Sequence, residues 1–265
     1  MKIDDFDKRA AKYTDARIHR FNRANNRFPQ VRAKERQCML DRLNLKDDIR
    51  FCDVSAGGGY LADGVFERLN GKVEITCIEN STAFASALRE KHNVVACSLS
   101  CISLSDSLFD RVACLAGVHH QRDKPAFYAE AFRILKPGGI LVIGDVLKGS
   151  PQASFLNGPV DIYTDIGHDG MFLEEGELSS QLEYAGFVEI EESIERYSWD
   201  FPDEETMILY CRDLFRMTKA SLPQVHEAVL EYLPVSREKA EVHLHWQLIF
   251  ATARKPSRIN FSGNL

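Results

Sequence analysis

Residues 109–146 read FDRVACLAGVHHQRDKPAFYAEAFRILKPGGILVIGDV. Two continuous apolar runs, Arg111–Ala116 and Ile140–Val146, flank a stretch near residues 124–135 that reads as a helix. Pro137 and Gly138 then provide a helix stop and a turn into the second run. Continuous apolar runs are typical of strands that are buried on both faces. The stretch therefore predicts two parallel strands joined by a helix.

The same alternation extends toward the N-terminus. Further strand-like runs lie at 49–54, 73–78 and 93–97, with helical stretches near 60–70 and 82–91. Strand–helix alternation of this kind predicts an α/β fold with a doubly wound, buried parallel sheet. Right-handed crossovers place the loops that follow the strands along one edge, and ligands bind at that edge.

The regions on either side of this alternation have a different sequence pattern. Residues 1–48 read as helical and are broken by Pro29. After about residue 150 we expect a loop, a helix ending at Gly186, a strand within 188–201, helices at about 203–219 and 223–233, and a strand within 244–253. We therefore predict an N-terminal helical lid over residues 1–48 and one domain over 49–265. Its cap insertions would lie at about 150–175 and 200–235.

Two features point to a nucleoside-like ligand. Residues 53–60, DVSAGGGY, directly follow the first predicted strand. Glycines there permit positive φ and close backbone approach, and the next helix offers free N–H groups. Glu79 ends the second strand about twenty residues later, where a carboxylate can accept both hydroxyls of a ribose. The alternative is a tight turn and a solvated glutamate.

Together these motifs resemble the class I S-adenosylmethionine (SAM)-dependent methyltransferases, in the small-molecule branch similar to ubiquinone/menaquinone methyltransferases. Phe109-Asp110, Val118-His119-His120 and the segment 133–139 (RILKPGG) occupy that family's characteristic positions. The resemblance covers residues 45–147 well and the rest loosely. It implies a Rossmann-like, mostly parallel, seven-stranded sheet with an antiparallel last strand, and SAM as cofactor.

The resemblance also implies which residues contact SAM. The set comprises Asp53, Ser55, Ala56, Gly57 and Gly59 at the methionine part, Glu79 at the ribose, Asn80, Ser98 and Leu99 at the adenine, and Ala116 and Gly117 at the reacting side. The sequence departs from the family pattern at Ser55, which replaces the first glycine of D-x-G-x-G-x-G, at Ala56, where the family usually has cysteine, and at Ser98, which replaces an adenine-binding aspartate.

The basic N-terminal segment adds two candidates. Between Lys8 and Arg36 there are ten Lys or Arg and two acids. Tyr13 would cap the sulfonium, and Arg32 would clamp the methionine carboxylate. The alternatives are a helix-packing tyrosine and a surface arginine on a solvated helical face.

Methyl transfer needs the acceptor, methyl group and sulfur in line, and a base only where the acceptor must lose a proton. His120 and Asp145 lie at the C-terminal ends of the fourth and fifth predicted strands. We predict that one of them, facing the acceptor pocket, orients or deprotonates the acceptor. A structural histidine and a capping aspartate are the alternative.

Composition narrows the class of protein. A net charge of −6 disfavours long nucleic acids as partners. No run approaches the ~18 apolar residues of a membrane span, and the charged start lacks a secretory signal, so we expect a cytoplasmic protein. Seven scattered cysteines indicate buried thiols, and Cys97 and Cys101 lack partners at zinc spacing, so we expect no metal site. We expect a small-molecule substrate and a monomer or homodimer.

Three functions remain in competition. The first is methyl transfer to a small-molecule acceptor, such as a secondary metabolite or a quinone-like compound. The second is a SAM-consuming enzyme of the same fold that transfers no methyl group, for example one that cyclises SAM to azetidine-2-carboxylate and releases methylthioadenosine. The third is a non-catalytic SAM-binding or partner-binding protein. A dinucleotide-dependent dehydrogenase is disfavoured, because the glycines are consecutive and do not form G-x-G-x-x-G.

Overall fold

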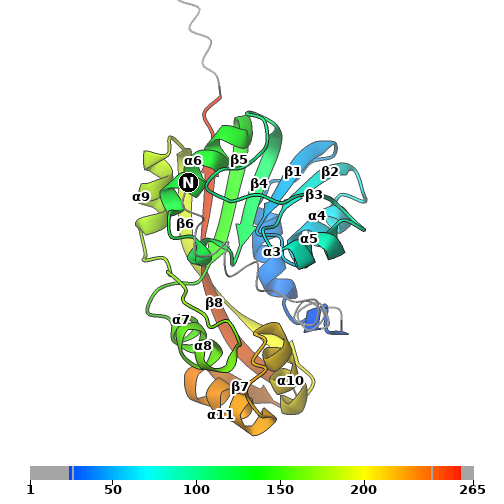
Figure 1. Cartoon of the computed structure of the whole chain (residues 1–265), viewed down its shortest axis with the longest axis vertical. Coiled ribbons are helices and arrows are strands. Elements are labelled where there is room, and N and C mark those ends of the chain that lie inside the picture. Colours follow the sequence, from blue (N-terminus) through cyan, green and yellow to red (C-terminus); the bar gives the residue numbers. More distant parts are fainter. Residues whose placement is uncertain (1–23, 26, 240, 258–265) are drawn as a thin grey trace, which may run out of the picture.

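The computed structural model describes residues 24, 25, 27–239 and 241–257 (Figure 1). Its strands are β1 (Ile49–Val54), β2 (Val73–Ile78), β3 (Asn93–Val95), β4 (Phe109–Leu115), β5 (Leu135–Asp145), β6 (Val188–Phe201), β7 (Val235–Glu238) and β8 (Glu241–Arg254). They form one sheet in the order β3-β2-β1-β4-β5-β8-β6, and β7 pairs with β8 outside that path.

The pairing confirms the predicted doubly wound sheet. The first five strands pair in parallel, and β8 is antiparallel to β5 and β6. The predicted count of seven strands was one short of the eight strands that the described residues form. The additional strand, β7, has the sequence VSRE and is mostly exposed, so it carries no apolar run that would signal a strand.

The LKPGG segment lies within β5 and not in a loop before it. β5 begins at Leu135, and the β4–β5 register shifts between Phe109 and Arg111. Gly138 has a φ of 78°, and a Cβ at Gly139 would lie 2.8 Å from the Lys136 carbonyl oxygen. The two glycines therefore form an irregularity that the strand accommodates, and the predicted start at residue 140 was five residues late.

The helices fall into two groups. Those beside the sheet are α3 (Ala33–Arg42), α4 (Tyr60–Arg68), α5 (Thr82–Leu88), α6 (Lys124–Ile134) and α9 (Glu177–Tyr184). Those of a separate lobe are α7 (Pro151–Phe155), a π-helical turn (Leu156–Val160), α8 (Asp161–Tyr163), α10 (Glu204–Leu214) and α11 (Leu222–Tyr232) (Figure 1). β6 and β8, 14 residues each, run from the sheet into this lobe.

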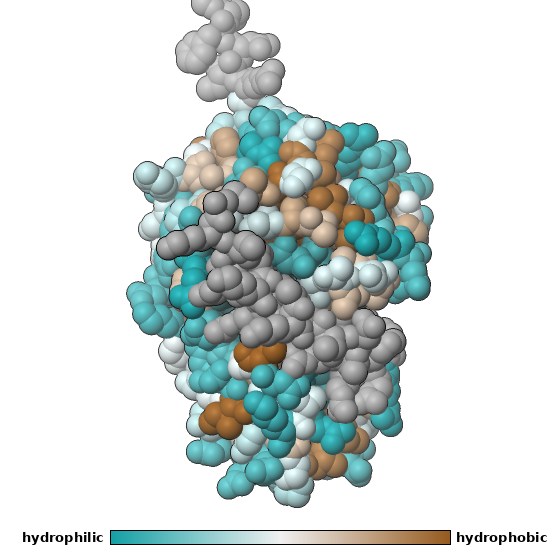
Figure 2. Space-filling view, viewed as in Figure 1, coloured by the Kyte–Doolittle hydropathy of each residue, from teal (hydrophilic) through white to brown (hydrophobic). Residues whose placement is uncertain are grey.

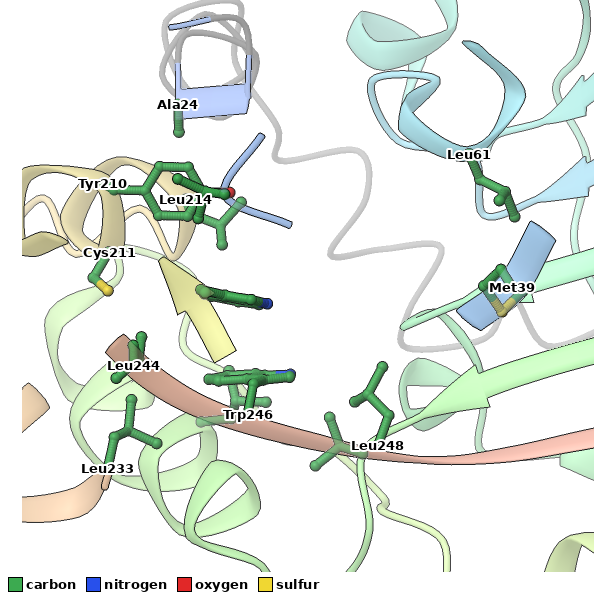
Figure 3. Close-up of a cluster of buried hydrophobic side chains, with 14 of the residues drawn as sticks. Ala24, Met39, Leu61, Tyr210, Cys211, Leu214, Leu233, Leu244, Trp246 and Leu248 are labelled. Carbon is green, nitrogen blue, oxygen red and sulfur yellow. The ribbon is translucent and has the colours of Figure 1, made fainter. Parts of the chain in front are cut away.

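The sheet has a hydrophobic core on each face. Val112 and Leu141 belong to one buried cluster, with Phe127 of α6, whereas their chain neighbours Ala113 and Val142 belong to the other. Successive residues of a strand point to opposite faces, so the continuous apolar runs of β4 and β5 supply both cores. The second cluster continues into the lobe, where β8 and α10 contribute large side chains (Figure 3).

The outer surface is mixed. Among the coloured residues in Figure 2, hydrophilic side chains predominate and hydrophobic ones lie between them. All seven cysteines are free thiols, and four of them are buried, while Cys101 is exposed. Within the described part of the chain, no helix combines the length and apolar character that crossing a bilayer requires.

Candidate cofactor and acceptor site

A single cavity extends from the carboxyl ends of β1, β2 and β4 to the helical lobe. It encloses about 1400 Å³ of empty space, including the part open to solvent. The sheet contributes the loops after these strands, and the lobe contributes Leu156, Val160, Leu214 and Phe215. The cavity thus lies at the sheet edge where α/β folds bind ligands.

Two loops meet tightly at the floor of the cavity. Ser55 and Ala116 have φ values of 58° and 53°, and Gly57 has 54°. A Cβ at Gly117 would lie 2.5 Å from the Ser55 Cβ, so only glycine permits this approach. The left-handed conformation costs a residue with a side chain about 1–2 kcal/mol. The β1 and β4 loops therefore each place a residue in the left-handed conformation at the cavity wall.

Glu79 is a buried carboxylate at the cavity wall. Its Oε2 accepts a hydrogen bond from Gly57 N and its Oε1 from Ser81 N, both at 2.8 Å. Burial raises the pKa of Glu79, although the backbone donors oppose the shift. A carboxylate has about four lone-pair sites, so these contacts leave acceptor capacity for ligand hydroxyls. The predicted contact of Glu79 with a ribose stays a prediction.

Asp53 is also buried and lines the same cavity. Its Oδ2 accepts a hydrogen bond from Ala62 N at 3.0 Å. Burial raises the pKa of Asp53 to about 8, against that hydrogen bond, and the nearby Glu79 and Asp63 add to the rise. The side chain is therefore mainly neutral at pH 7 when the cavity holds no cation.

Asp53 gives the folded protein a pH dependence that an Asp53→Asn variant should lack. The folded state keeps a proton that the unfolded state loses, so stability falls from about pH 4 to about pH 8, by up to about 1.4 kcal/mol per pH unit. Asparagine is neutral and can still accept from Ala62 N. Urea unfolding without SAM measures the free energy of unfolding at pH 6 and at pH 9. Its decrease between these two pH values should be smaller for Asp53→Asn than for the wild type. The exposed Asp106→Asn is the control, and equal decreases in Asp53→Asn and wild type would contradict this account.

Arg32 lies at the cavity wall and is 9% exposed, so it is not a surface arginine. Its Nε donates to Glu35 Oε1 at 2.9 Å, and its guanidinium lies over the rings of Tyr60 (4.9 Å) and Trp199 (5.6 Å). Glu35 also accepts from the Tyr197 hydroxyl at 3.1 Å. The methionine-carboxylate role of Arg32 stays a prediction, and Glu35 is a partner that the sequence did not indicate.

Asp145 does not face the acceptor pocket, which corrects the prediction from sequence. Asp145 is fully buried, and it is not one of the described residues that line the cavity. Its Oδ1 lies 2.6 Å from His119 Nδ1, and its Oδ2 accepts from Val118 N (2.7 Å) and His119 N (3.0 Å). The carboxylate turns inward because it binds the N–H groups of the short turn Val118–His120. His119 and His120 line the cavity in its place.

The structure brings most of the other predicted residues together. Those at the cavity wall are Ser55, Ala56, Gly57, Asn80, Leu99, Ala116 and Gly117. Gly59 instead precedes α4 and faces Leu88, and the Ser98 hydroxyl lies 3.0 Å from that of Ser100, so neither is part of the wall. Tyr13 lies outside the described residues. The individual roles in binding SAM stay predictions.

Sequence reasoning missed much of the lobe side of the cavity. The residues it did not single out include Tyr60, Phe84, Phe215, Arg216, Trp246 and Leu248. From the sequence, Tyr163, His168, Trp199 and Phe201 are also plausible pocket walls. The structure places His168 and Trp199 at the cavity wall, whereas Tyr163 and Phe201 are not among the lining residues. The one feature of the sequence that could have indicated Trp246 as a wall residue is the rarity of tryptophan, because the chain has two.

Comparison with known proteins identifies the sheet region. Residues 52–143 match the family described as "Methyltransferase domain". The chain contains a class I SAM-dependent methyltransferase domain. This domain holds Glu79, the glycine loop and the β4 loop, and SAM is the cofactor of such domains.

Relatives of the methyltransferase domain act on different acceptors. The chain is 32% identical over 97 residues to the erythromycin 3''-O-methyltransferase of Saccharopolyspora erythraea, covering 31% of this chain and 29% of that one. It is 28% identical over 111 residues to the ubiquinone/menaquinone biosynthesis C-methyltransferase UbiE of Bordetella avium, covering 39% and 43%. The match thus spans less than half of either relative.

The fold extends beyond the matched domain. The crystal structure of the [4+2]-cyclase SpnF superimposes with a TM-score of 0.57 at 21% identity, covering 84% of this chain and 80% of that one. At this level of identity the likeness concerns the fold alone.

Proposed function

We propose that the protein transfers the methyl group of SAM to a small-molecule acceptor. One observation carries the proposal: a single cavity joins the Glu79 end, where the nucleoside part of SAM would bind, to an aromatic wall in the lobe. SAM would occupy the sheet end, and the acceptor would lie against the lobe. In-line transfer needs this juxtaposition inside a site that excludes water.

The aromatic wall favours a planar, largely apolar acceptor. Trp199 and Trp246 stack with centroids 4.3 Å apart and an interplanar angle of 17°. Phe215 lies nearly parallel to Trp246 at 5.7 Å. Figure 3 shows Trp246 and Leu248 along β8. Because the cationic Arg32 already lies over Trp199, we propose a neutral acceptor, such as a quinone-like compound or a secondary metabolite, over a cationic one.

We also propose that residues 49–265 act as one domain with cap insertions at about 150–175 and 200–235. The supporting observation is that the lobe helices gather from both insertions, since α7 packs on α11 and α10 packs on α11. The predicted lid over residues 1–48 includes residues 1–23, which lie outside the described residues. His120, at the cavity wall, is the proposed residue that orients or deprotonates the acceptor.

A second candidate is intramolecular cyclisation of SAM to azetidine-2-carboxylate. Such a step needs a neutral, desolvated amine as nucleophile. The favouring observation is that Asp53, in the position proposed for the methionine part, has a pKa raised to about 8 by burial, so its ionised form is a stronger base than an ordinary carboxylate. The SpnF likeness adds that this fold also occurs in a protein named as a cyclase.

The deciding experiment incubates the full chain with SAM alone, then with a panel of phenolic and quinone-like acceptors. Methylthioadenosine and S-adenosylhomocysteine are quantified by mass spectrometry against an enzyme-free control. We expect no excess methylthioadenosine, and S-adenosylhomocysteine only with an acceptor. Methylthioadenosine from SAM alone would overturn methyl transfer in favour of cyclisation. Neither product, with SAM binding intact by calorimetry, would indicate a non-catalytic protein.

A further inference from the structure

Three histidines from two separate loops converge at the acceptor side of the cavity. His119 and His120 belong to the turn after β4, and His168 belongs to the loop after α8. Each ring offers a nitrogen, and the three nitrogens lie within 4.8 Å of one another. The ring centroids are 4.0 Å apart for His119 and His120, and 5.4 Å and 5.2 Å from these to His168.

The tautomer of His119 follows from its partner. Asp145 Oδ1 lies 2.6 Å from His119 Nδ1. The other oxygen of Asp145 accepts from two backbone N–H groups, which favours the ionised carboxylate. An ionised carboxylate only accepts hydrogen bonds, so Nδ1 carries the proton. In the neutral ring, Nε2 then presents a lone pair.

The tautomer of His168 is determined in a similar way. Its Nδ1 lies 2.9 Å from Asn157 Oδ1. The orientation of the Asn157 amide is fixed, because its Nδ2 donates to Gly170 O (2.9 Å) and its Oδ1 accepts from Gly170 N (2.8 Å). The amide oxygen therefore accepts from His168 Nδ1–H, and Nε2 of this ring also presents a lone pair.

We propose that His119, His120 and His168 bind a divalent transition-metal ion of the Zn²⁺ type. Metal-binding histidines usually donate their second N–H to a carboxylate or carbonyl oxygen, as His119 does to Asp145 and His168 to Asn157. Imidazole ligands suit Zn²⁺, Cu²⁺, Fe²⁺ and Ni²⁺. The proposal rests on the histidine geometry and does not depend on methyl transfer.

The expectation of no metal site rested on the spacing of the cysteines, and this cluster contains no cysteine. His168 is 48 residues from His120 in the sequence, so no local spacing rule connects them. The adjacent pair converges because residues 118–120 form a 3-10 turn, whereas neighbours in a strand would point to opposite faces.

Three protein ligands leave a coordination position for a further group, as in catalytic zinc sites. This consequence rests on the proposed function: an acceptor oxygen at that position would have its pKa lowered by the ion, which would prepare a hydroxyl or phenol for methylation. A metal-bound acceptor would then require no strong protein base.

Metal binding can be measured without SAM or acceptor, so its outcome is independent of turnover. The full chain, without an affinity tag and treated with chelator, is titrated with Zn²⁺ by calorimetry and with Co²⁺ by visible absorption. We expect one equivalent to bind, with Co²⁺ bands that report nitrogen coordination. His168→Ala and His120→Ala, both of partly exposed residues, should each weaken Zn²⁺ binding about 100-fold or more, and Asp145→Asn about 10–100-fold.

His226→Ala is the matched control, because His226 pairs with Glu204 at α10 and is not part of the cavity wall. It should keep wild-type affinity. Absence of a bound equivalent in the folded wild-type protein would overturn the proposal. Wild-type affinity in both His168→Ala and His120→Ala would do the same, since the ion would then be held elsewhere.

Discussion

Glu79→Gln is expected to weaken SAM binding about 100-fold or more. In the proposed complex the carboxylate accepts two ribose hydroxyls, and a hydrogen bond to a charged group contributes about 1.5–3 kcal/mol. The amide keeps the shape of the side chain but loses the charge and one of the two accepting oxygens. Because about 1.4 kcal/mol corresponds to a tenfold change in affinity, the loss of both interactions gives a factor of this size. The dissociation constant can be measured by calorimetry.

The matched control is Glu74→Gln on β2, the strand that Glu79 follows. Glu74 is exposed and pairs with Arg50 at the surface. It should bind SAM as the wild type does. Because Glu79 also accepts hydrogen bonds from Gly57 N and Ser81 N, the substitution can lower stability as well as affinity. A melting curve of each variant separates the two effects. A well-folded Glu79→Gln protein with an affinity within threefold of the wild type would remove Glu79 from the ribose site.

The sheet could be predicted because its strands carry their signal locally. β1 and β2 were predicted with the bounds that the structure shows, since each is a short apolar run between turn residues. β7 left no such signal, because only one of its four side chains is apolar and three are exposed. The bounds of β5 were shifted because Pro137 and Gly138 suggested a turn, whereas the strand absorbs them in an irregular register.

The cofactor side of the site was predictable for the same reason. Its residues lie at the carboxyl ends of the strands or shortly after them, so placing the strands also places Asp53, Glu79 and Gly117 at one edge. The acceptor side depends on contacts between distant segments. Trp246 meets Trp199 because β6 and β8 are paired antiparallel. His168 meets His120 because the segment after α8 returns to the turn after β4, where Met171 N donates to His119 O.

Asp145 shows how position along a strand can mislead about direction. Its place at the end of β5 suggested a side chain in the pocket. Its side chain instead points inward, where it accepts hydrogen bonds from the N–H groups of Val118 and His119. Asp145 contacts the His119 ring, and this ring lines the cavity. Such a contact depends on the conformation of a turn 26 residues away in the sequence, and no spacing pattern encodes it.

Asp145→Ala is expected to lower the free energy of unfolding by about 3 kcal/mol or more. The substitution removes the acceptor from the buried N–H groups of Val118, His119 and Val146, and an unsatisfied buried group costs about 1–3 kcal/mol. For a chain of this size the melting temperature should fall by roughly 6–12 °C. Urea unfolding of chelator-treated protein measures the difference without a contribution from bound metal.

The surface pair of Asp47 and Lys72 provides the control, because Asp47→Ala removes an exposed ion pair worth at most about 1 kcal/mol.

The effect of Asp145→Ala should also depend on pH. Burial alone would raise the pKa of Asp145, but the His119 ring and the backbone donors lower it below its ordinary value. The stabilisation by the carboxylate is therefore complete above about pH 4 and is lost as the pH falls through the lowered pKa. The difference between wild type and variant should shrink in that acidic range, and a difference that instead grew there would show that Asp145 is protonated in the folded protein.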